Sequence, residues 1–367
     1  MATLNRFFEG LRVVELASVL AGPAVGMFFA ELGAEVIKIE NKKTGGDMTR
    51  GWKLPSEDPQ SPTSAYYHSI NWGKEAILLN LEVEEDRQQA LQWIQTADIV
   101  ISNFKTEAAK RLGMDYESLS AVHPGLIYAQ LHAFDENSDL PAFDVVLQAE
   151  AGFLYMTGEP DREPVKMPVA LIDLLAAHQL KEGVLVALLQ RERTGRGSLV
   201  STSLLASAIA SLANQAANWL TAGHIPQRMG SQHPNIAPYG DIYYCADGKP
   251  VVMAVGTDRQ FRQLLDVLQL GALCVDERFN NNAARVANRS ELNNRLAQAV
   301  KAFNRDELLE QCHARQVPVA GIRDMKEVFE QPSAQRLVLE TRYPDGSISR
   351  CVKTVVFGID EGREARI

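Results

Sequence analysis

The strongest constraint on the fold is an alternation of short apolar strands and helices near the start of the chain. Residues 12–16 (RVVEL) predict a strand, which breaks at Ala21-Gly22-Pro23. Residues 24–32 predict a helix that Gly33 ends, and residues 34–40 (AEVIKIE) predict a second strand. Strand, helix and strand in such close succession form a βαβ unit, with parallel strands and a right-handed crossover.

The same alternation continues to about residue 131. Further strands are predicted at 76–81, 99–102 and 126–131, and further helices at 84–96 and 106–112. Strands that alternate with helices favour an α/β class with an open, mostly parallel, Rossmann-like sheet. Ligands of such sheets bind beyond the carboxyl ends of the strands.

The second half of the chain predicts a different organisation. A long helix is expected at 174–193 and an Ala-rich helix at 204–220, and residues 222–238 have the Gly, Pro, His and Asn content of a linker. The 367 residues favour two domains at roughly 150 residues each. We therefore expect a large domain of residues 1–222 and 322–367 and a small α/β domain of residues 223–321.

Composition excludes several classes of protein. The apolar share of 46% and charged share of 23% are ordinary for a globular enzyme, and the net charge of −9 argues against nonspecific nucleic-acid binding. Without an apolar run of ~18 residues, no membrane span is expected. The four cysteines form no Cys-x-x-Cys pair, which predicts no metal site and favours free thiols in the cytoplasm.

Common catalytic signatures are absent from the sequence. It contains no G-x-x-x-x-G-K-[ST], G-x-S-x-G, H-E-x-x-H or G-x-G-x-x-G. Three other stretches lie where a ligand edge is expected: 18–23 (SVLAGP), 45–52 (GGDMTRGW) and 168–174 (PVALIDL). In the last of them, Asp173 precedes the predicted long helix, where an aspartate is ordinarily a helix cap.

Together with the phrases LGAEVIKIE, ADIVISNF, LIYA, RERTGRG and HPNIAPY, these stretches resemble the family III CoA-transferases (the CaiB/BaiF family) in order and spacing. The resemblance covers nearly the whole chain, to about residue 330. It implies a large Rossmann-like domain, a smaller domain and an interlocked homodimer. It also implies that acyl-CoA and a small carboxylic acid are the substrates, with no permanently bound cofactor.

By this resemblance, Asp173 matches the family's nucleophilic aspartate. The cap and the nucleophile are compatible, because a helix N-terminus favours an ionised carboxylate and only that form attacks a thioester. The implied cycle is a double displacement through a mixed anhydride and an aspartyl-CoA thioester. One thioester is exchanged for another, so neither ATP nor a metal ion is needed.

The resemblance also places a CoA site at the strand ends. The implied contacts with the pantetheine arm are Val19, Leu20 and Ala21. Those with the nucleotide are Leu79, Asn103, Phe104 and Lys105, and the implied contact with the phosphates is Arg111. Asn41 falls where the best-known family member carries an arginine, and Lys42 or Lys43 is the alternative for that contact.

Two other functions are weighed against this one. A 2-methylacyl-CoA racemase shares the fold and the aspartate but needs a histidine in a G-H-D sequence. Here residues 141–144 read PAFD, and Phe143 cannot move a proton. A non-catalytic CoA-binding or scaffold protein is the second alternative. Members of the resembling family usually have a P-L-L-G-E-H-T segment after the region that reads VKTVVFGID here, and this sequence does not show it. The retained Asp173 argues against this alternative.

Overall fold

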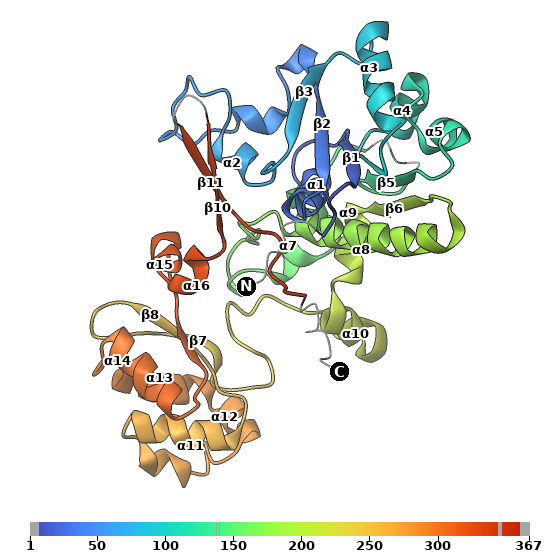
Figure 1. Cartoon of the computed structure of the whole chain (residues 1–367). Helices are drawn as coiled ribbons and strands as arrows, with labels where there is room; N and C mark the ends of the chain where they lie inside the picture. Colours follow the sequence, from blue (N-terminus) through green and yellow to red (C-terminus); the bar gives the residue numbers. More distant parts are fainter. Residues whose placement is uncertain (1–6, 137, 139, 344–346, 360–367) are drawn as a thin grey trace, which may run out of the picture. The chain divides into compact units, whose positions relative to one another are not determined.

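The computed structural model describes residues 7–136, 138, 140–343 and 347–359, and the chain divides into two compact units (Figure 1). The large unit comprises Met1–Phe153, Met167–Gly223 and Ser333–Ile367, and the small unit comprises Leu154–Lys166 and His224–Pro332. The small unit therefore includes residues 154–166 and 322–332, which the sequence predicts to be part of the large domain.

A six-stranded parallel sheet forms the centre of the large unit, in the order β3-β2-β1-β4-β5-β6. The strands are β1 Arg12–Glu15, β2 Glu35–Asn41, β3 Glu75–Leu79, β4 Ile99–Ser102, β5 Ile127–His132 and β6 Leu199–Ser203. This is the doubly wound order, whose switch point lies between β1 and β4. The predicted α/β class is confirmed, and β6 is an additional strand that the sequence analysis did not predict.

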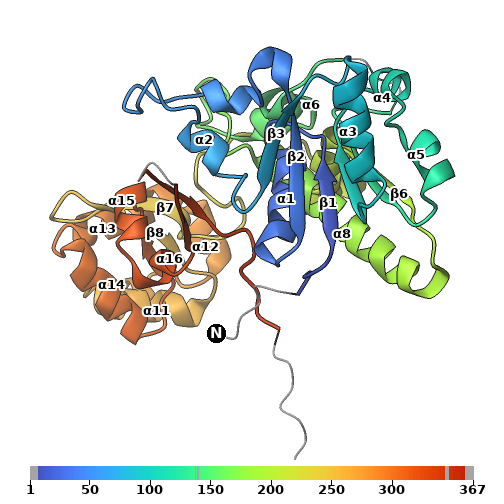
Figure 2. The ribbon, with the colours of Figure 1, turned by 45° about the horizontal axis from the view of Figure 1, so that its top comes forward.

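Alternate strand residues bury opposite faces of this sheet. Val13 of β1 and Ile99 of β4 pack with α1 (Ala21–Glu31), α8 (Leu171–Thr194) and α9 (Leu204–Ala210) on one face. Val14 and Val100, one residue further along, pack on the other face with α3 (Glu84–Ile94) and with Leu119 of α5. Figure 2 shows α1 and α3 beside β1 to β3. The two-residue period of the strands thus buries both faces.

Three of the predicted helices differ from the structure by more than two residues or in number. Helix α1 begins at Ala21 rather than at residue 24, so Ala21-Gly22-Pro23 is its first turn, where a proline needs no N–H partner. Helix α8 begins at Leu171, which places Asp173 inside the helix. The Ala-rich segment forms two helices, α9 and α10 (Ala213–Ala222), rather than one.

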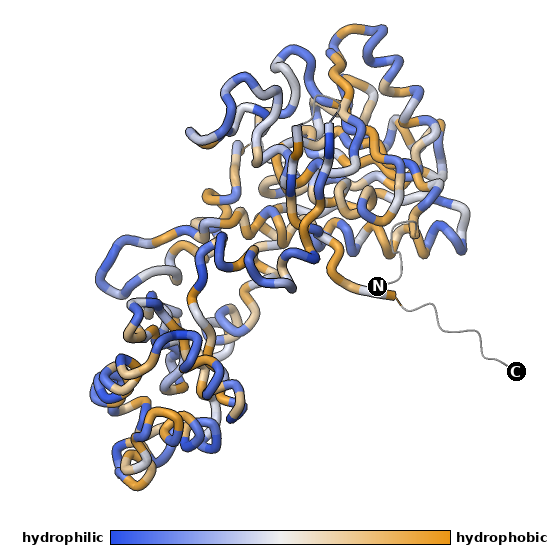
Figure 3. Tube along the Cα trace, turned by 60° about the vertical axis from the view of Figure 1, so that its left-hand side comes forward, coloured by the Kyte–Doolittle hydropathy of each residue, from blue (hydrophilic) through white to orange (hydrophobic). Residues whose placement is uncertain are grey.

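The small unit contains an antiparallel sheet in the order β7-β8-β9 and a separate hydrophobic core. Its strands are β7 Tyr239–Tyr244, β8 Pro250–Ala254 and β9 Val319–Gly321. Helices α11 (Asp258–Val267), α12 (Asn282–Ala287), α13 (Arg289–Val300) and α14 (Arg305–Ala314) belong to this unit. Hydrophilic and hydrophobic segments alternate along the helical turns of the chain in Figure 3, as amphipathic packing requires.

The remaining elements are short. They are α2 Ala65–His68, α4 Thr106–Leu112, α5 Tyr116–Val122, α6 Asp144–Glu150, α7 Phe153–Met156, α15 Met325–Phe329, α16 Pro332–Gln335, the hairpin β10 Val338–Arg342 and β11 Ile348–Val352, and the 3-10 turns η1 Lys42–Thr44, η2 Met48–Gly51 and η3 Gly271–Cys274. After the hairpin, Glu31 of α1 accepts hydrogen bonds from the backbone N–H groups of Thr354 and Val355. Among the helices of the described residues, none has the length and apolarity needed to cross a bilayer.

Candidate active site

The turn between β1 and α1 lies at the switch point of the sheet and is held by side chains from two neighbouring segments. Asn103, which follows β4, donates its amide N–H to Ser18 O (3.1 Å) and accepts from Ser18 N–H (3.3 Å). Val19 has a φ of 75°, which a β-branched residue rarely adopts, and its N–H donates to Asp47 Oδ2 (3.2 Å). The turn is therefore fixed in a strained conformation.

A buried group of charges lies beneath this turn. Lys38 Nζ donates to Glu15 Oε1 (2.7 Å) and Ala17 O (2.8 Å), and it pairs with Asp47 Oδ2 (3.1 Å). Burial lowers the pKa of Lys38, but the two carboxylates outweigh it and leave the pKa raised. Gly26 is required here, because a Cβ at that position would lie 1.9 Å from a Glu15 oxygen. Lys38 and Asp47 together thus fix the backbone on both sides of Ser18.

Asp47 is itself positioned by a second buried carboxylate. Its N–H donates to Glu40 Oε2 (2.7 Å), which also accepts from Arg50 Nε (2.6 Å), and Tyr67 donates to Glu40 Oε1 (2.8 Å). Gly46 precedes Asp47 at a φ of 111°, where a Cβ would lie 2.4 Å from Glu40. The stretch 45–52 therefore folds around Glu40, and this packing directs Asp47 toward the β1–α1 turn.

Asp173 is the third residue of α8 and is only 8% exposed. It is not the helix cap: the carboxylate that accepts the first-turn N–H groups of Ile172 (2.6 Å) and Asp173 (3.3 Å) belongs to Asp144. Burial and the charge of Asp144 raise the pKa of Asp173 to about 7. The cap interpretation was wrong because the helix begins earlier and Asp144 occupies its donors.

Tyr66 interacts with Asp173 and belongs to a group of aromatic side chains. Burial and the charges of Asp173, Asp144 and Asp47 raise the pKa of Tyr66 to about 12, so its hydroxyl stays protonated at neutral pH. Trp52 contacts Tyr66 edge-on, with ring centroids 5.0 Å apart, and lies 6.3 Å from the ring of Phe143. Asp173 thus interacts with a neutral phenol and with the negative charge of Asp144.

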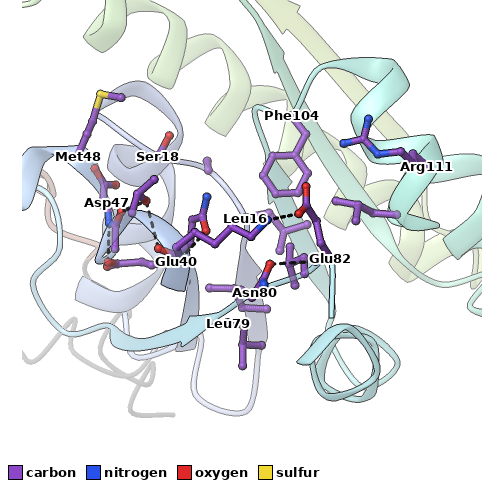
Figure 4. A pocket seen from close by; sticks show the side chains of 18 residues that line it. Leu16, Ser18, Glu40, Asp47, Met48, Leu79, Asn80, Glu82, Phe104 and Arg111 are labelled. Atoms are coloured by element: carbon purple, nitrogen blue, oxygen red, sulfur yellow. Dashed lines mark hydrogen bonds and ion pairs between the residues drawn. The ribbon is translucent and has the colours of Figure 1, made fainter. Parts of the chain in front are cut away.

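A cavity of about 390 Å³ opens at the carboxyl ends of β1, β2 and β3 (Figure 4). Four residues of the predicted CoA site line it: Asn41, Leu79, Phe104 and Arg111. Lys43 also lines it and forms an ion pair with Glu82 of the same wall, whereas Lys42 does not line it. Asn41 uses its side-chain oxygen to accept from Lys43 N–H (2.9 Å). The cavity thus has an apolar floor and two cationic side chains at its wall.

The other predicted CoA contacts lie elsewhere. Asn103 and Lys105 line a second cavity, of about 460 Å³, which shares Phe104 with the first. Val19, Leu20 and Ala21 line neither cavity, and the side chains of Leu20 and Ala21 are buried in the core.

Sequence reasoning gave no role to three residues that shape this site: Asp47, Tyr66 and Asp144. Asp47 lies in the stretch 45–52, and Asp144 lies in the PAFD sequence considered for a racemase. For both, a carboxylate close to the end of a predicted strand was the sequence feature that could have indicated a role in the site. Tyr66 carried no signal. Within the described ranges, no three His, Cys, Asp or Glu side chains are grouped so that they could hold a metal ion.

Comparisons with known proteins agree with this geometry. The family model described as CoA-transferase family III matches residues 8–363. The chain is 38% identical to a succinate–glutarate CoA-transferase of Agrobacterium fabrum, covering 95% of this chain and 88% of that protein. It is 36% identical to an acetyl-CoA:oxalate CoA-transferase of Acetobacter aceti, covering 89% and 83%. The crystal structure of a CAIB/BAIF family protein from Brucella suis superimposes with a TM-score of 0.85 at 38% identity, covering 97% and 93%.

Proposed function

Because the chain belongs to family III of the CoA-transferases and is an acyl-CoA:carboxylate CoA-transferase, we propose that Asp173 is its nucleophile. The observation that carries the proposal is the state of this carboxylate. It is buried, its pKa is raised to about 7, and no described residue donates a hydrogen bond to its oxygens. Such an oxygen is more basic than an ordinary aspartate and is not occupied by a structural contact.

The reaction follows as a double displacement. The Asp173 carboxylate attacks the carbonyl carbon of the donor thioester, the C–S bond breaks, and CoA leaves as a thiolate. The thiolate then attacks the Asp173 carbonyl of the mixed anhydride, which releases the donor acid and leaves an aspartyl-CoA thioester. The acceptor carboxylate attacks this thioester, and the thiolate released attacks the acceptor carbonyl and frees Asp173. Each step exchanges one acyl bond for another, so no permanently bound cofactor is needed.

We place the nucleotide end of CoA in the 390 Å³ cavity, on the wall formed by Leu79 and Phe104. Arg111 and Lys43 are the cations there that suit its phosphates, Arg111 through its fixed fork of donors. From this cavity, which Ala17 and Ser18 also line, the pantetheine arm follows the β1–α1 turn toward Asp173. Asn103 acts by fixing Ser18 in place.

We propose a small dicarboxylic acid as the acceptor. The names of three relatives, which act on succinate and glutarate, oxalate or mesaconate, support this choice. We also propose the interlocked homodimer of the resembling family, in the cytoplasm. For a racemase, the position before Asp144 is occupied by Phe143, which cannot move a proton, and Asp144 is engaged as a helix cap.

Product analysis and trapping test the proposal together. The enzyme is incubated with acetyl-, succinyl- or formyl-CoA and a series of mono- and dicarboxylic acids, and new thioesters are identified by mass spectrometry. Hydroxylamine added during turnover should convert Asp173 to its hydroxamate, and the mass change should map to the peptide that contains it. Asp173→Asn should form no product and no adduct.

Two results would contradict this function. An unmodified Asp173 peptide in enzyme that is turning over, or full activity of Asp173→Asn, would remove Asp173 from the chemistry. CoA binding without any transfer across the acid series would favour the non-catalytic alternative. Loss of the α-proton stereochemistry of a 2-methylacyl-CoA would favour the racemase.

A further inference from the structure

We propose that Asp144 is a positioning residue for this reaction: its carboxylate takes the first-turn N–H groups of α8 and presents a like charge to the nucleophile. The inference rests on the proposed role of Asp173. It concerns a residue of α6 that lies 29 positions earlier in the chain and reaches Asp173 only through the fold.

The orientation of Asp144 is fixed from two sides. Its Oδ2 accepts from Ile172 N–H (2.6 Å) and from Asp173 N–H (3.3 Å). Its Oδ1 accepts from the side-chain amide of Gln148, which is buried, and Gln148 Oε1 in turn accepts from Met167 N–H (2.9 Å). The carboxylate is therefore held by both of its oxygens and has little freedom to turn away from Asp173.

Asp144 deprives Asp173 of the N–H groups that would otherwise stabilise its ionised form. A carboxylate in the first turn of a helix is ordinarily stabilised by the free N–H groups and the positive end of the helix dipole. Here Asp144 occupies those donors, and its own charge adds repulsion. Desolvation together with that charge therefore raises the pKa of Asp173, where an unblocked helix start would lower it.

This arrangement favours acylation. The repulsion between the two carboxylates exists only while Asp173 is ionised, and it disappears when Asp173 becomes an anhydride or a thioester. An interaction that destabilises the free nucleophile but not the covalent intermediate lowers the barrier between them. Asp144 touches no reacting atom in this scheme and acts through Asp173 alone.

Other charged groups near α8 do not explain the effect. Tyr66 on α2 interacts with Asp173, but its raised pKa keeps it neutral at working pH. Of the elements packed on α8, β6 and α9 contain no titratable side chain. The titratable residue of α1 is Glu31, which binds Thr354 and Val355. Those of β5 are Tyr128, whose pKa is raised to about 12 by burial and whose hydroxyl donates to Met114 O (2.8 Å), and His132, whose charged neighbour is Glu136. Besides Asp144, α6 carries only Glu150, which is exposed.

The test measures the titration of Asp173 directly. Protein labelled with ¹³C at the aspartate carboxyl carbons is titrated by NMR, and the Asp173 signal is identified by its loss in Asp173→Asn. Asp144→Asn removes the charge and keeps an acceptor for Ile172 N–H. Asp144→Ser is the second variant, since it caps the helix without placing an amide against Gln148. Asp115→Asn is the matched control, because Asp115 caps α5 by accepting from Ser118 N–H (3.1 Å).

In both Asp144 variants the pKa of Asp173 should fall, and the acid limb of kcat/KM should move to lower pH by the same amount. The plateau kcat should fall while the KM for acyl-CoA stays unchanged, which loss of a cap alone would not produce. Asp115→Asn should titrate as the wild type.

An Asp173 titration that is the same in wild type and in both Asp144 variants would overturn the inference. The NMR measurement needs no catalysis, so the two proposals fail separately. If hydroxylamine labels Asp173 and its titration ignores Asp144, only this inference fails. If the titration shifts but Asp173 is never labelled, the nucleophile assignment fails.

Discussion

At the scale of single residues, Asp173 is an ionisable group that the fold leaves without a favourable partner. Its pKa of about 7 in the folded chain lies above the ordinary value of 3.8. Because the folded chain holds the Asp173 proton more tightly than the unfolded chain does, this group contributes stability that is fully present below about pH 4. That contribution is lost as the pH rises through 7 and Asp173 ionises in the folded chain. The ionised nucleophile therefore costs roughly 4 kcal/mol at most, taking 1.36 kcal/mol per unit.

The first prediction follows from that sign. Asp173→Asn cannot ionise, so it should gain stability relative to wild type as the pH rises from about 4 to about 8, by up to a few kcal/mol. Urea unfolding of both proteins at several pH values measures the difference. At pH 4 the two should be nearly equal, since wild-type Asp173 is then protonated. A difference that stays constant across this range would mean that Asp173 is not buried as a charge.

Arg111 carries the second residue-scale prediction. It is exposed at the wall of the cavity, so Arg111→Ala should leave the melting temperature unchanged. A phosphate contact far from the thioester stabilises ground and transition states alike, so KM for both acyl-CoA substrates should rise more than kcat falls. Arg259→Ala, an exposed arginine of the small unit, is the control for net charge. An unchanged KM with a reduced kcat would place Arg111 in the chemistry instead.

The residue roles show where sequence reasoning ends. Asp173, Asn41, Leu79, Phe104 and Arg111 were reached through resemblance, and the structure places the last four around one cavity. The raised pKa of Asp173 could not be predicted from its helix position, because it depends on a carboxylate that the fold brings from a distant segment. Contacts of that kind have no local signature in a sequence.

At the scale of elements, apolar periodicity predicted the strands with mostly apolar sequences and missed a polar edge strand and the start of a helix. Five of the six parallel strands were predicted, because each is a short run of mostly apolar residues that alternates with helical segments. Strand β6 (LVSTS) has exposed and polar positions at an edge of the sheet and gave too weak a signal. The start of α8 was misplaced by three residues because Asp173 resembled a cap. Local propensity cannot decide between a cap and a first-turn residue when the true cap lies elsewhere.

The buried charges beneath the β1–α1 turn give an element-scale prediction. Asp47→Ala should lower the free energy of unfolding by roughly 3–5 kcal/mol, since it leaves Lys38 buried with one carboxylate fewer and frees the Val19 N–H. Lys38→Met should cost a similar amount. The double variant should cost clearly less than the sum, because both changes break the same contact. Urea unfolding of the four proteins measures this coupling.

An exposed pair on the same strands is the matched control. Arg12 and Glu35 join β1 to β2 at 3.1 Å, with 53% and 55% of their side chains exposed. Arg12→Met and Glu35→Ala should each cost about 1 kcal/mol or less, and their effects should add. If the Asp47 and Lys38 effects also add, the two side chains do not act as one unit, and each holds the turn through its own backbone contact.

At the scale of the whole molecule, the large unit exposes apolar side chains that a monomer would ordinarily cover. On α8 these are Val186 (64% exposed) and Leu189 (63%), and on α10 they are Trp219 (54%) and Leu220 (79%). Val186 and Leu189 are three positions apart and share one face of α8, and exposed apolar helix faces mark interaction surfaces. A second copy of this chain is the partner that the resemblance to interlocked transferases implies.

The last prediction concerns the strength of that assembly. If each chain threads through the other, separation requires unfolding, and dilution alone cannot produce monomers. Sedimentation at nanomolar concentration should therefore show a single species of twice the 40.5 kDa chain mass, with smaller species appearing only together with loss of secondary structure in urea. Leu220→Glu separates threading from ordinary packing. A packed dimer weakened by one buried charge would dissociate reversibly on dilution, whereas a threaded dimer would stay whole and merely unfold at lower urea. A reversible monomer–dimer equilibrium of the wild type would exclude interlocked chains.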